Sequence, residues 1–294
     1  MRIGIDLGGT KIEITVLAHD GTIALRERVA APACDYGATL RVIADLVTGA
    51  EARLNVRASV GVGIPGTVSP ATGLVKNANS TWLVGKPFDK DLAAALARPV
   101  RVANDANCFA LSEAVDGVGA GKHVVFGVIV GTGVGGGIVV GGRILTGHHA
   151  IAGEWGHNPL PWPRDEEHPG PTCYCGKTGC IETYLSGGGL AADHARVTGE
   201  KRDVQDIAAN APETMAHYLD RFARALASVI NILDPDIIVL GGGLSNIDMI
   251  YDELPARLGA YVFSDRCTTP VLRNVHGDSG GVRGAAWLWP KDQG

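Results

Sequence analysis

The chain has 294 residues, is 46% apolar and 5% aromatic, and carries a net charge of −5. This length predicts about two domains, and an acidic charge without a basic run argues against a nucleic-acid partner. No apolar stretch reaches the ~20 residues of a membrane span, and the N-terminus lacks the apolar region of a signal peptide. We therefore expect a cytoplasmic protein with no membrane partner, in a compartment where disulfides are rare.

The first predicted elements form a β-hairpin around a glycine turn. Residues 2–7 are a mostly apolar strand, Gly8-Gly9-Thr10-Lys11 is the turn, and residues 12–18 alternate like a second strand. Three further elements follow in this half of the chain: a helix over 36–54, a strand over 58–65, and a strand over 98–105 that ends on Asn104-Asp105.

The pattern of strand, glycine turn and strand returns near the middle of the chain. Residues 124–130 are a buried strand, 131–137 a glycine turn, and 138–145 a strand again. We interpret this return as an internal duplication. The last third then predicts a helix over 215–233, a strand over 236–243 that runs into a third glycine turn, and a final helix over 281–290.

The glycine turns predict an anion site and not a dinucleotide fold. Gly131, Gly133 and Gly136 match G-x-G-x-x-G, but that motif must open a helix, and the β-branched run 138–140 is a poor helix start. A glycine hairpin instead exposes successive backbone N–H groups, which form an anion-binding concavity. Two such hairpins facing each other can hold a polyphosphate, and the third turn at 241–243 can accept an adenosine.

Three of the six cysteines fall within the eight residues "CYCGKTGC", at positions 173–180. Three thiolates and one further ligand make the closed tetrahedral zinc site of structural zinc proteins. His157, just upstream in "GEWGHNP", is the best candidate for the fourth ligand. The proline-rich loop 159–171 between these ligands has little packing potential of its own, so we expect zinc binding to supply its ordering energy.

Six motifs together resemble the ROK family of sugar kinases, within the sugar kinase, actin and Hsp70 superfamily. They are "DLGGTK" at 6–11, "ANDANC" at 103–108, "GTGVGGG" at 131–137, "EWGH" at 154–157, "CYCGKTGC" at 173–180 and "LGGG" at 240–243. The match is collinear and covers essentially the whole chain. It implies an α/β fold, a duplicated actin-like (ribonuclease H-like) ATPase with two domains and a cleft between them. The stretches 77–92 and 276–290 further resemble the bacterial fructokinase (mannofructokinase) branch.

The resemblance implies an ATP-dependent hexose kinase with Mg²⁺, a structural Zn²⁺ and a homodimeric assembly. D-fructose, with mannose as a second substrate, is the expected acceptor, and the product is the 6-phosphate. N-acetylglucosamine kinase and glucokinase share every motif, so both stay open. The family also contains repressors with a winged helix-turn-helix segment before the kinase domain. We expect no such function here, because the phosphate turn starts within the first ten residues.

The resemblance also assigns roles to single residues. Asp105 is implied as the general base, and the sugar ligands implied with it are Asn79, Asn104, Asp105, Glu154, His157 and Glu182. Zinc is implied on His157, Cys173, Cys175 and Cys180, His157 using its second ring nitrogen for the sugar. Nucleotide and Mg²⁺ contacts are expected from Asp6, Gly8, Gly9, Thr10, Lys11, Gly131, Thr132, Gly133, Gly135, Gly136, Gly241, Gly242 and Gly243. Two of these residues have an alternative interpretation. Asp6 can instead initiate the turn, and Lys11 can be a solvated lysine at a strand edge.

No low-complexity linker separates the halves, so we expect a hinge over 113–121. The N-terminal domain then spans 1–116 and is completed by the C-terminal helix 281–294, and the C-terminal domain spans 117–280 with the zinc-binding loop. The glycines at 117, 119 and 121 can absorb backbone rotation when the cleft closes on substrate. Trp287 and Trp289 are expected to report that closure.

Overall fold

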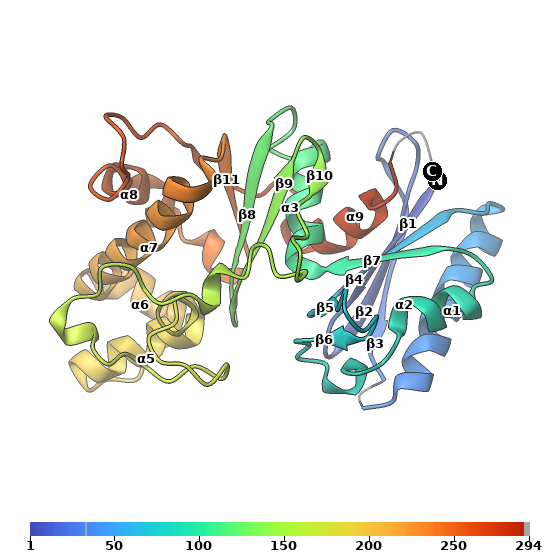
Figure 1. The fold of residues 1–294 in the computed structure, drawn as a ribbon, viewed down its shortest axis with the longest axis horizontal. Coiled ribbons are helices and arrows are strands. Elements are labelled where there is room, and N and C mark those ends of the chain that lie inside the picture. The colour runs from blue at the N-terminus through green and yellow to red at the C-terminus, as the bar shows by residue number, and fades with distance from the viewer. Residues whose placement is uncertain (33, 291–294) are drawn as a thin grey trace.

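The computed structural model describes residues 1–32 and 34–290, which form two α/β domains lying side by side (Figure 1). Each domain is built on a five-stranded sheet. The strands of the first sheet, in spatial order, are β3 (Ile23–Ala30), β2 (Lys11–Leu17), β1 (Arg2–Leu7), β4 (Ser59–Ile64) and β7 (Val100–Asn104). Those of the second sheet are β10 (Arg143–Ile144), β9 (Val134–Val140), β8 (Val124–Val130), β11 (Ile237–Gly241) and β12 (Val271–Arg273). Two short strands, β5 (Thr67–Val68) and β6 (Val75–Lys76), pair separately.

The two sheets share one topology. In the first, β1 pairs with β2 antiparallel and with β4 parallel, and in the second β8 pairs in the same way with β9 and β11. The outer strands follow the same rule, since β3 and β10 are antiparallel to their neighbours while β7 and β12 are parallel to theirs. The predicted duplication is therefore present in the strand order of both sheets.

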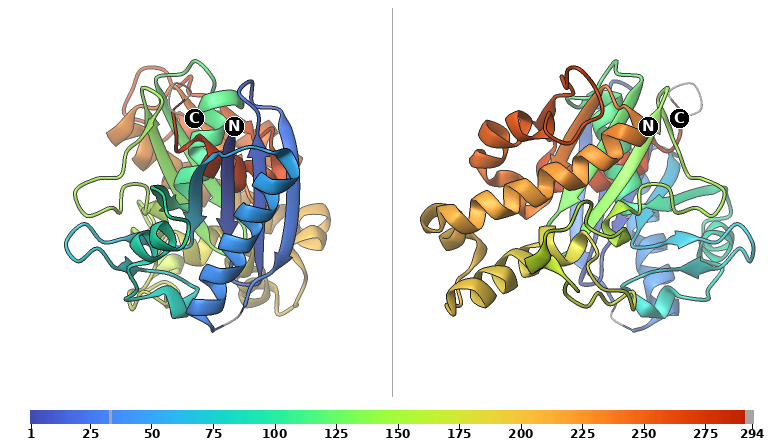
Figure 2. Two further views of the ribbon diagram at one scale, coloured as in Figure 1. Left: turned by 90° about the vertical axis from the view of Figure 1, so that its right-hand side faces the viewer. Right: turned by 60° about the vertical axis from the view of Figure 1, so that its left-hand side comes forward.

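Helices cover the sheets on both sides. The described helices are α1 (Tyr36–Leu54), α2 (Phe88–Ala95), α3 (Asp105–Asp116), α4 (Glu182–Leu185), α5 (Gly187–Thr198), α6 (Val204–Asn210), α7 (Pro212–Leu233), α8 (Asp248–Leu258) and α9 (Gly280–Trp287). Figure 2 shows α1 lying across the first sheet and the long α7 running along the second domain. Helices α3 and α9 lie between the two sheets (Figure 1). Within the described residues, no helix has both the length and the apolar character needed to cross a membrane.

The close packing of α9 depends on glycines in the strands beneath it. A Cβ on Gly4 of β1 would lie 2.0 Å from the Val282 carbonyl oxygen, and one on Gly61 of β4 would lie 1.9 Å from the Ala285 carbonyl oxygen. Any side chain at these positions would lift the helix off the sheet, so the end of the chain packs directly on its first strand. The division into 1–116 and 117–280 stays a prediction, and residues 291–294 of the predicted C-terminal segment lie outside the described residues.

The second glycine turn is shorter than the sequence predicts. Strand β9 begins at Val134, so only residues 131–133 turn, and Gly135 and Gly136 lie within the strand. The reason is close packing on both faces of β9. A Cβ on Gly136 would lie 2.8 Å from the Gly153 carbonyl oxygen, and one on Gly137 would lie 2.4 Å from the Ala106 carbonyl oxygen. These glycines let β9 approach α3 and the loop before His157, instead of turning the chain.

Candidate active site

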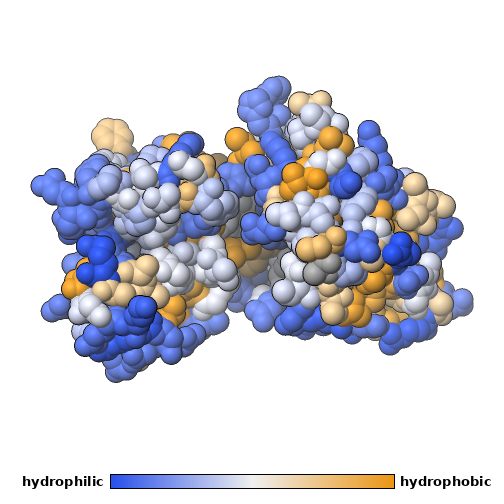
Figure 3. Space-filling model, turned by 90° about the horizontal axis from the view of Figure 1, so that it is seen from below, coloured by the Kyte–Doolittle hydropathy of each residue, from blue (hydrophilic) through white to orange (hydrophobic). Residues whose placement is uncertain are grey.

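A cavity of about 290 Å³ lies between the two domains. Figure 3 shows the molecule hollowed between its two lobes. All six predicted sugar-binding residues line this cavity: Asn79, Asn104 and Asp105 from the first domain, and Glu154, His157 and Glu182 from the second. Residues that are more than a hundred positions apart in the sequence therefore meet at one place. The sequence analysis did not single out Pro65, Gly66, Asn77 or Tyr174, which line the same cavity.

Asp105 opens α3 at the carboxyl end of β7. Asn104 caps the helix, because its Oδ1 accepts hydrogen bonds from the Ala106 N–H (2.9 Å) and the Asn107 N–H (3.3 Å), and its Nδ2 donates to the Gly66 carbonyl oxygen (3.2 Å). The amide of Asn104 is thus largely occupied by the backbone, and it fixes the direction of the neighbouring carboxylate. The contact of Asn104 with a sugar hydroxyl stays a prediction. Only the second Nδ2–H of this amide remains to make that contact.

Burial raises the pKa of Asp105 to about 6. The hydrogen bond from the Ala106 N–H opposes this shift, whereas the nearby charge of Glu154 adds to it. A carboxylate with a pKa near 6 is ionised at neutral pH and is also a better proton acceptor than an ordinary aspartate. Asp105 therefore has the environment of a general base.

Asp6 lies close enough to Asp105 for the charge of one carboxylate to affect the other. It is the last residue but one of β1, with Gly63 of β4 as its parallel partner. Burial, together with the charges of Asp105 and Glu13, raises the pKa of Asp6 to about 7, and Arg28 opposes the shift. Two buried carboxylates that repel each other fit a divalent cation, because Mg²⁺ prefers oxygen ligands and would relieve the repulsion. The residues present are therefore compatible with the predicted Mg²⁺ site.

We expect Asp6→Asn to stabilise the protein at pH 8 in the absence of Mg²⁺. The folded-state pKa is raised from 3.8 to about 7, so folding favours the protonated acid, and stability falls as pH rises from about 4 to about 7. The neutral amide avoids this loss, which the shift in pKa places at about 4 kcal/mol. Thermal denaturation at pH 4 and pH 8 should show a difference between variant and parent only at pH 8. A variant less stable than the parent at pH 8 would contradict this account.

Glu182 connects the cysteine loop to the second glycine turn. It begins α4, two residues after Cys180, and its Oε2 accepts a hydrogen bond of 2.9 Å from the Val134 N–H. A Cβ on Gly133 would lie 2.7 Å from the same oxygen, so a side chain there would displace the Glu182 carboxylate from this position. The position of the cysteine loop and the shape of the turn are therefore coupled through one carboxylate.

The four predicted zinc ligands lie together. The ligand atoms of His157, Cys173, Cys175 and Cys180 all lie within 4.8 Å of one another. The Sγ of Cys173 is 3.6 Å from His157 Nδ1, and the Sγ atoms of Cys175 and Cys180 are 3.6 Å apart. Ligands of a tetrahedral zinc with Zn–S bonds of about 2.3 Å lie roughly 3.8 Å apart, so the donor set and spacing fit zinc. His157 Nε2 lies 3.0 Å from the Tyr174 hydroxyl, a partner that the sequence analysis missed.

The proline-rich loop between these ligands has an anchor that the sequence analysis also missed. Glu167 is buried, and its carboxylate accepts hydrogen bonds from Arg221 (2.8 Å) and Arg224 (2.6 Å) of α7. Asp193 of α5 pairs with the same Arg221 at 2.6 Å. The expectation that zinc alone orders this loop was therefore incomplete, because a buried ion-pair network holds it as well.

The three glycine turns occupy two places. The first turn lies in the first domain, where the Gly8 N–H donates to the Lys11 carbonyl oxygen at 2.9 Å. The second and third turns lie together in the second domain, since a Cβ on Gly131 would be 3.7 Å from the Gly243 nitrogen. Of the predicted nucleotide residues, four line the 290 Å³ cavity, namely Thr132, Gly133, Gly135 and Gly136. Asp6, Gly8, Gly9, Thr10, Lys11, Gly131 and Gly241 to Gly243 do not line it.

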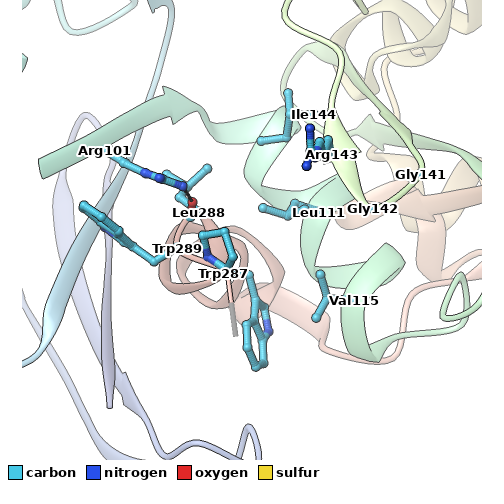
Figure 4. Close-up of a pocket in the computed structure, with 11 residues that line it drawn as sticks. Arg101, Leu111, Val115, Gly141, Gly142, Arg143, Ile144, Trp287, Leu288 and Trp289 are labelled. Carbon is cyan, nitrogen blue, oxygen red and sulfur yellow. Dashed lines mark hydrogen bonds between the residues drawn. The ribbon is translucent and has the colours of Figure 1, made fainter. Parts of the chain in front are cut away.

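A larger cavity, of about 660 Å³, is lined by Leu111 and Val115 of α3, by the turn between β9 and β10, and by residues 287–290 (Figure 4). Arg101, Arg143 and Trp289 line it, and no described acidic residue does, so it lacks a group that could accept a proton. Trp287 Nε1 donates to Asp116 at 3.0 Å, and Trp289 Nε1 donates to the Val60 carbonyl oxygen at 2.7 Å. Both predicted reporters of domain closure are thus bonded to residues of the first domain, and both line a cavity to which Arg143 and Ile144 of the second domain also contribute.

A family model described as the ROK family matches residues 2–292. The chain belongs to the ROK family. It is 40% identical to a protein of Vibrio cholerae named N-acetyl-D-glucosamine kinase, over 98% of this chain and 99% of that protein. A ROK hexokinase from Thermus thermophilus has a similar structure, with a TM-score of 0.83, 30% identity, and coverage of 97% of this chain and 96% of that one. A ROK family glucokinase from Streptomyces griseus, solved with glucose and AMPPNP, has a TM-score of 0.75, 27% identity, and coverage of 98% of both chains.

These findings confirm the resemblance to the ROK family and the predicted actin-like α/β fold with two domains. They support the coarser functional prediction, an ATP-dependent sugar kinase. They do not confirm fructose as the substrate, because the Vibrio relative is named for N-acetyl-D-glucosamine and not for fructose. N-acetylglucosamine kinase is one of the alternatives given above, since the motifs do not distinguish the two sugars.

Proposed function

We propose that this ROK family protein phosphorylates N-acetyl-D-glucosamine with ATP to give the 6-phosphate. The observation that carries the choice of sugar is the 40% identity to the Vibrio cholerae N-acetyl-D-glucosamine kinase across nearly the full length of both chains. The site is consistent with a sugar substrate. Asp105, Glu154 and Glu182 place three carboxylates around one small cavity, where they can accept hydrogen bonds from sugar hydroxyls.

In the proposed reaction the sugar hydroxyl oxygen attacks the γ-phosphorus of ATP, and Asp105 accepts the hydroxyl proton. The bond from the γ-phosphorus to the bridging oxygen breaks, and ADP leaves. Thr132 and Gly133 line the cavity, and their backbone N–H groups would supply hydrogen bonds to the phosphate oxygens, whereas the Gly131 N–H already donates to the Gly133 carbonyl oxygen at 3.0 Å. Asp6 would hold Mg²⁺, which when bound would neutralise part of the phosphate charge.

The proposed zinc site has a structural role in this scheme. His157, Cys173, Cys175 and Cys180 provide four ligands, which leaves no open position for a substrate. The site would position two carboxylates that lie close to its ligands in the sequence. Glu182 follows Cys180 by two residues, and Glu154 precedes His157 by three. Holding the four ligands together therefore holds the two sugar-facing carboxylates.

A coupled assay of ADP formation with N-acetylglucosamine, glucose, mannose and fructose tests the proposal. We expect the highest kcat/KM with N-acetylglucosamine and ATP. A preference for fructose or mannose would support the assignment to the fructokinase branch instead. A preference for glucose would favour a hexokinase like the Thermus neighbour. Turnover with polyphosphate in place of ATP would show that ATP is not the only phosphoryl donor. Turnover with none of these sugars would reject the proposal that the protein is a sugar kinase. The homodimer stays a prediction, to be measured by light scattering.

The rate is expected to fall at acidic pH with an apparent pKa near 6. Asp105 must be ionised to accept a proton, and its pKa is raised to about 6. Below that value kcat/KM should decrease about tenfold per pH unit. A profile measured from pH 5 to pH 8 at constant ionic strength checks this, with a denaturation curve at each pH as the control. A flat profile across this range would exclude Asp105 as the proton acceptor.

A further inference from the structure

The cavity of about 660 Å³ in Figure 4 has no part in the proposed reaction. Arg101 of β7 lines it from the first sheet, and Arg143 of β10 lines it from the second. Leu111 and Val115 line it from α3, which lies between the sheets. Ligand cavities in proteins have volumes of about 300–1,000 Å³, so this cavity is large enough for a small organic molecule.

The polar groups that line this cavity favour an anion. The carbonyl oxygen of Leu288 already accepts a hydrogen bond from Arg101 at 2.6 Å, and the Arg101 guanidinium carbon lies 4.2 Å from the centre of the Trp289 ring. The indole N–H groups of Trp287 and Trp289 are engaged as well. Arg143 is exposed and forms no ion pair with any described residue. The cavity therefore presents the positive charge of Arg143 with no described carboxylate to balance it.

A tight turn fixes the position of Arg143. Gly141 and Gly142 have φ values of 56° and 74°, and two consecutive positive φ values are what a two-residue hairpin of type I′ requires. Arg143 follows directly and pairs with Val140 of β9. A guanidinium binds a carboxylate, phosphate or sulfonate through two parallel hydrogen bonds. Ile144, the next residue, lines the cavity too, so an acid-binding group and an apolar side chain lie next to each other.

Helix α3 connects this cavity to the proposed catalytic site. Asp105 begins α3 and lines the cavity of about 290 Å³, whereas Leu111 and Val115 line the larger one. At 1.5 Å per residue, these two side chains start roughly 9 and 15 Å along the helix from Asp105. A molecule in the larger cavity would thus contact the helix that carries the proposed general base, together with one strand of each sheet.

We propose that this cavity is a second ligand site, for an organic anion that carries an apolar ring. The acid group pairs with Arg143, and the ring packs on Leu111, Val115 and Ile144. The occupant contacts both sheets at once, so it opposes the movement of one sheet relative to the other and slows turnover. The effect on turnover rests on the proposed function, whereas the binding does not.

The probe for this site is 8-anilinonaphthalene-1-sulfonate, a fluorescent aromatic anion, titrated into the full chain with and without AMPPNP and Mg²⁺. We expect one saturable site that AMPPNP does not abolish. Arg143→Gln should weaken binding about 3–10-fold, as for a lost charge-assisted pair. Val115→Phe should weaken it at least about tenfold, because the new ring takes the space of the ligand's own. N-phenyl-1-naphthylamine, which lacks the acid group, should bind less tightly than the sulfonate.

The control is Arg57→Gln, the same change at an exposed position between α1 and β4, which should leave binding unchanged. A thermal melt of each variant checks folding. Binding that AMPPNP abolishes would belong to the nucleotide site, and binding that neither cavity variant weakens would lie elsewhere, so either result overturns the proposal. Probe binding seen only with a chain that ends at Pro290 would assign the cavity to the chain's own last residues and would overturn it too.

The effect on turnover is measured as ADP formed with N-acetylglucosamine, separated by chromatography, with and without saturating probe. We expect kcat to fall at least about threefold in the parent and to stay unchanged in Val115→Phe. An equal kcat with and without probe in the parent would overturn the coupling between the two cavities. If the parent phosphorylates no sugar, the proposed function fails, while the titrations still decide whether the anion site exists.

Discussion

Asp105→Asn is expected to fold normally and to lose about 10²–10⁴-fold in kcat. The carboxylate lines the inter-domain cavity and has a pKa raised by burial, so it is placed to accept the proton of a sugar hydroxyl. An amide of the same size cannot accept that proton. It can still accept the Ala106 N–H bond at the start of α3, so the helix should keep its N-terminus.

Steady-state kinetics with saturating sugar and ATP measure this loss, and a thermal melt checks folding. Asp252→Asn is a matched control, since it makes the same chemical change on an exposed position of α8. We expect full activity in that control. If Asp105→Asn keeps kcat within tenfold of the parent, another group must accept the proton. If it loses both activity and the folded state, Asp105 is structural.

Glu167→Gln is expected to destabilise the protein by about 3–5 kcal/mol. The buried Glu167 carboxylate receives hydrogen bonds from Arg221 and Arg224, both of which are also buried. Burial alone would raise the pKa of this acid, but the bonds from Arg224 and Arg221 hold it at about 2. Glutamine leaves two buried guanidinium groups with too little negative charge and turns an NH₂ group toward one of them.

Urea denaturation at pH 7 measures the effect, and Glu166→Gln supplies the control. Glu166 is the adjacent residue and is exposed, so its substitution should stay within about 0.5 kcal/mol of the parent. The direction in which this stabilisation changes with pH also follows from the pKa of Glu167. The folded-state pKa lies below the ordinary value of 4.5, so this contribution is present above pH 4.5 and is lost as pH falls toward 2. Equal midpoints for the two variants would show that the network adds nothing to stability.

Local patterns in the sequence predicted the parts of the site that depend on short spacing. The three cysteines fall within eight residues, and each glycine turn lies directly after a strand, so both features are visible without a fold. The duplication is visible for the same reason. His157 is harder, because 16 residues separate it from Cys173, and it was found through its glycine-flanked motif.

The features that the sequence did not predict depend on contacts between distant residues, or on whether a glycine turns the chain or only permits close packing. Glu167 is 54 residues from Arg221 in sequence, and within "RDEEHP" it is indistinguishable from an exposed charge run. Gly135 and Gly136 were expected to turn the chain, and periodicity cannot separate a glycine that turns from one that permits close packing. Tyr174 was passed over because the cysteines on either side explained the segment. Its bond to His157 requires knowing which way the histidine ring points.

The packing of α9 on β1 has a consequence for the order in which the protein matures on the ribosome. The bare backbone faces of Gly4 and Gly61 meet α9 and no other described helix so closely, yet α9 follows β12, the last strand of the second sheet, in the chain. The domain whose strands emerge first therefore waits for a helix that is made after the second sheet. The second domain has its own sheet and buried core and can assemble earlier, while the first waits with an uncovered apolar face for the final helix. A ribosome that stalls or releases the chain shortly before residue 280 would leave that face open to chaperones and to aggregation.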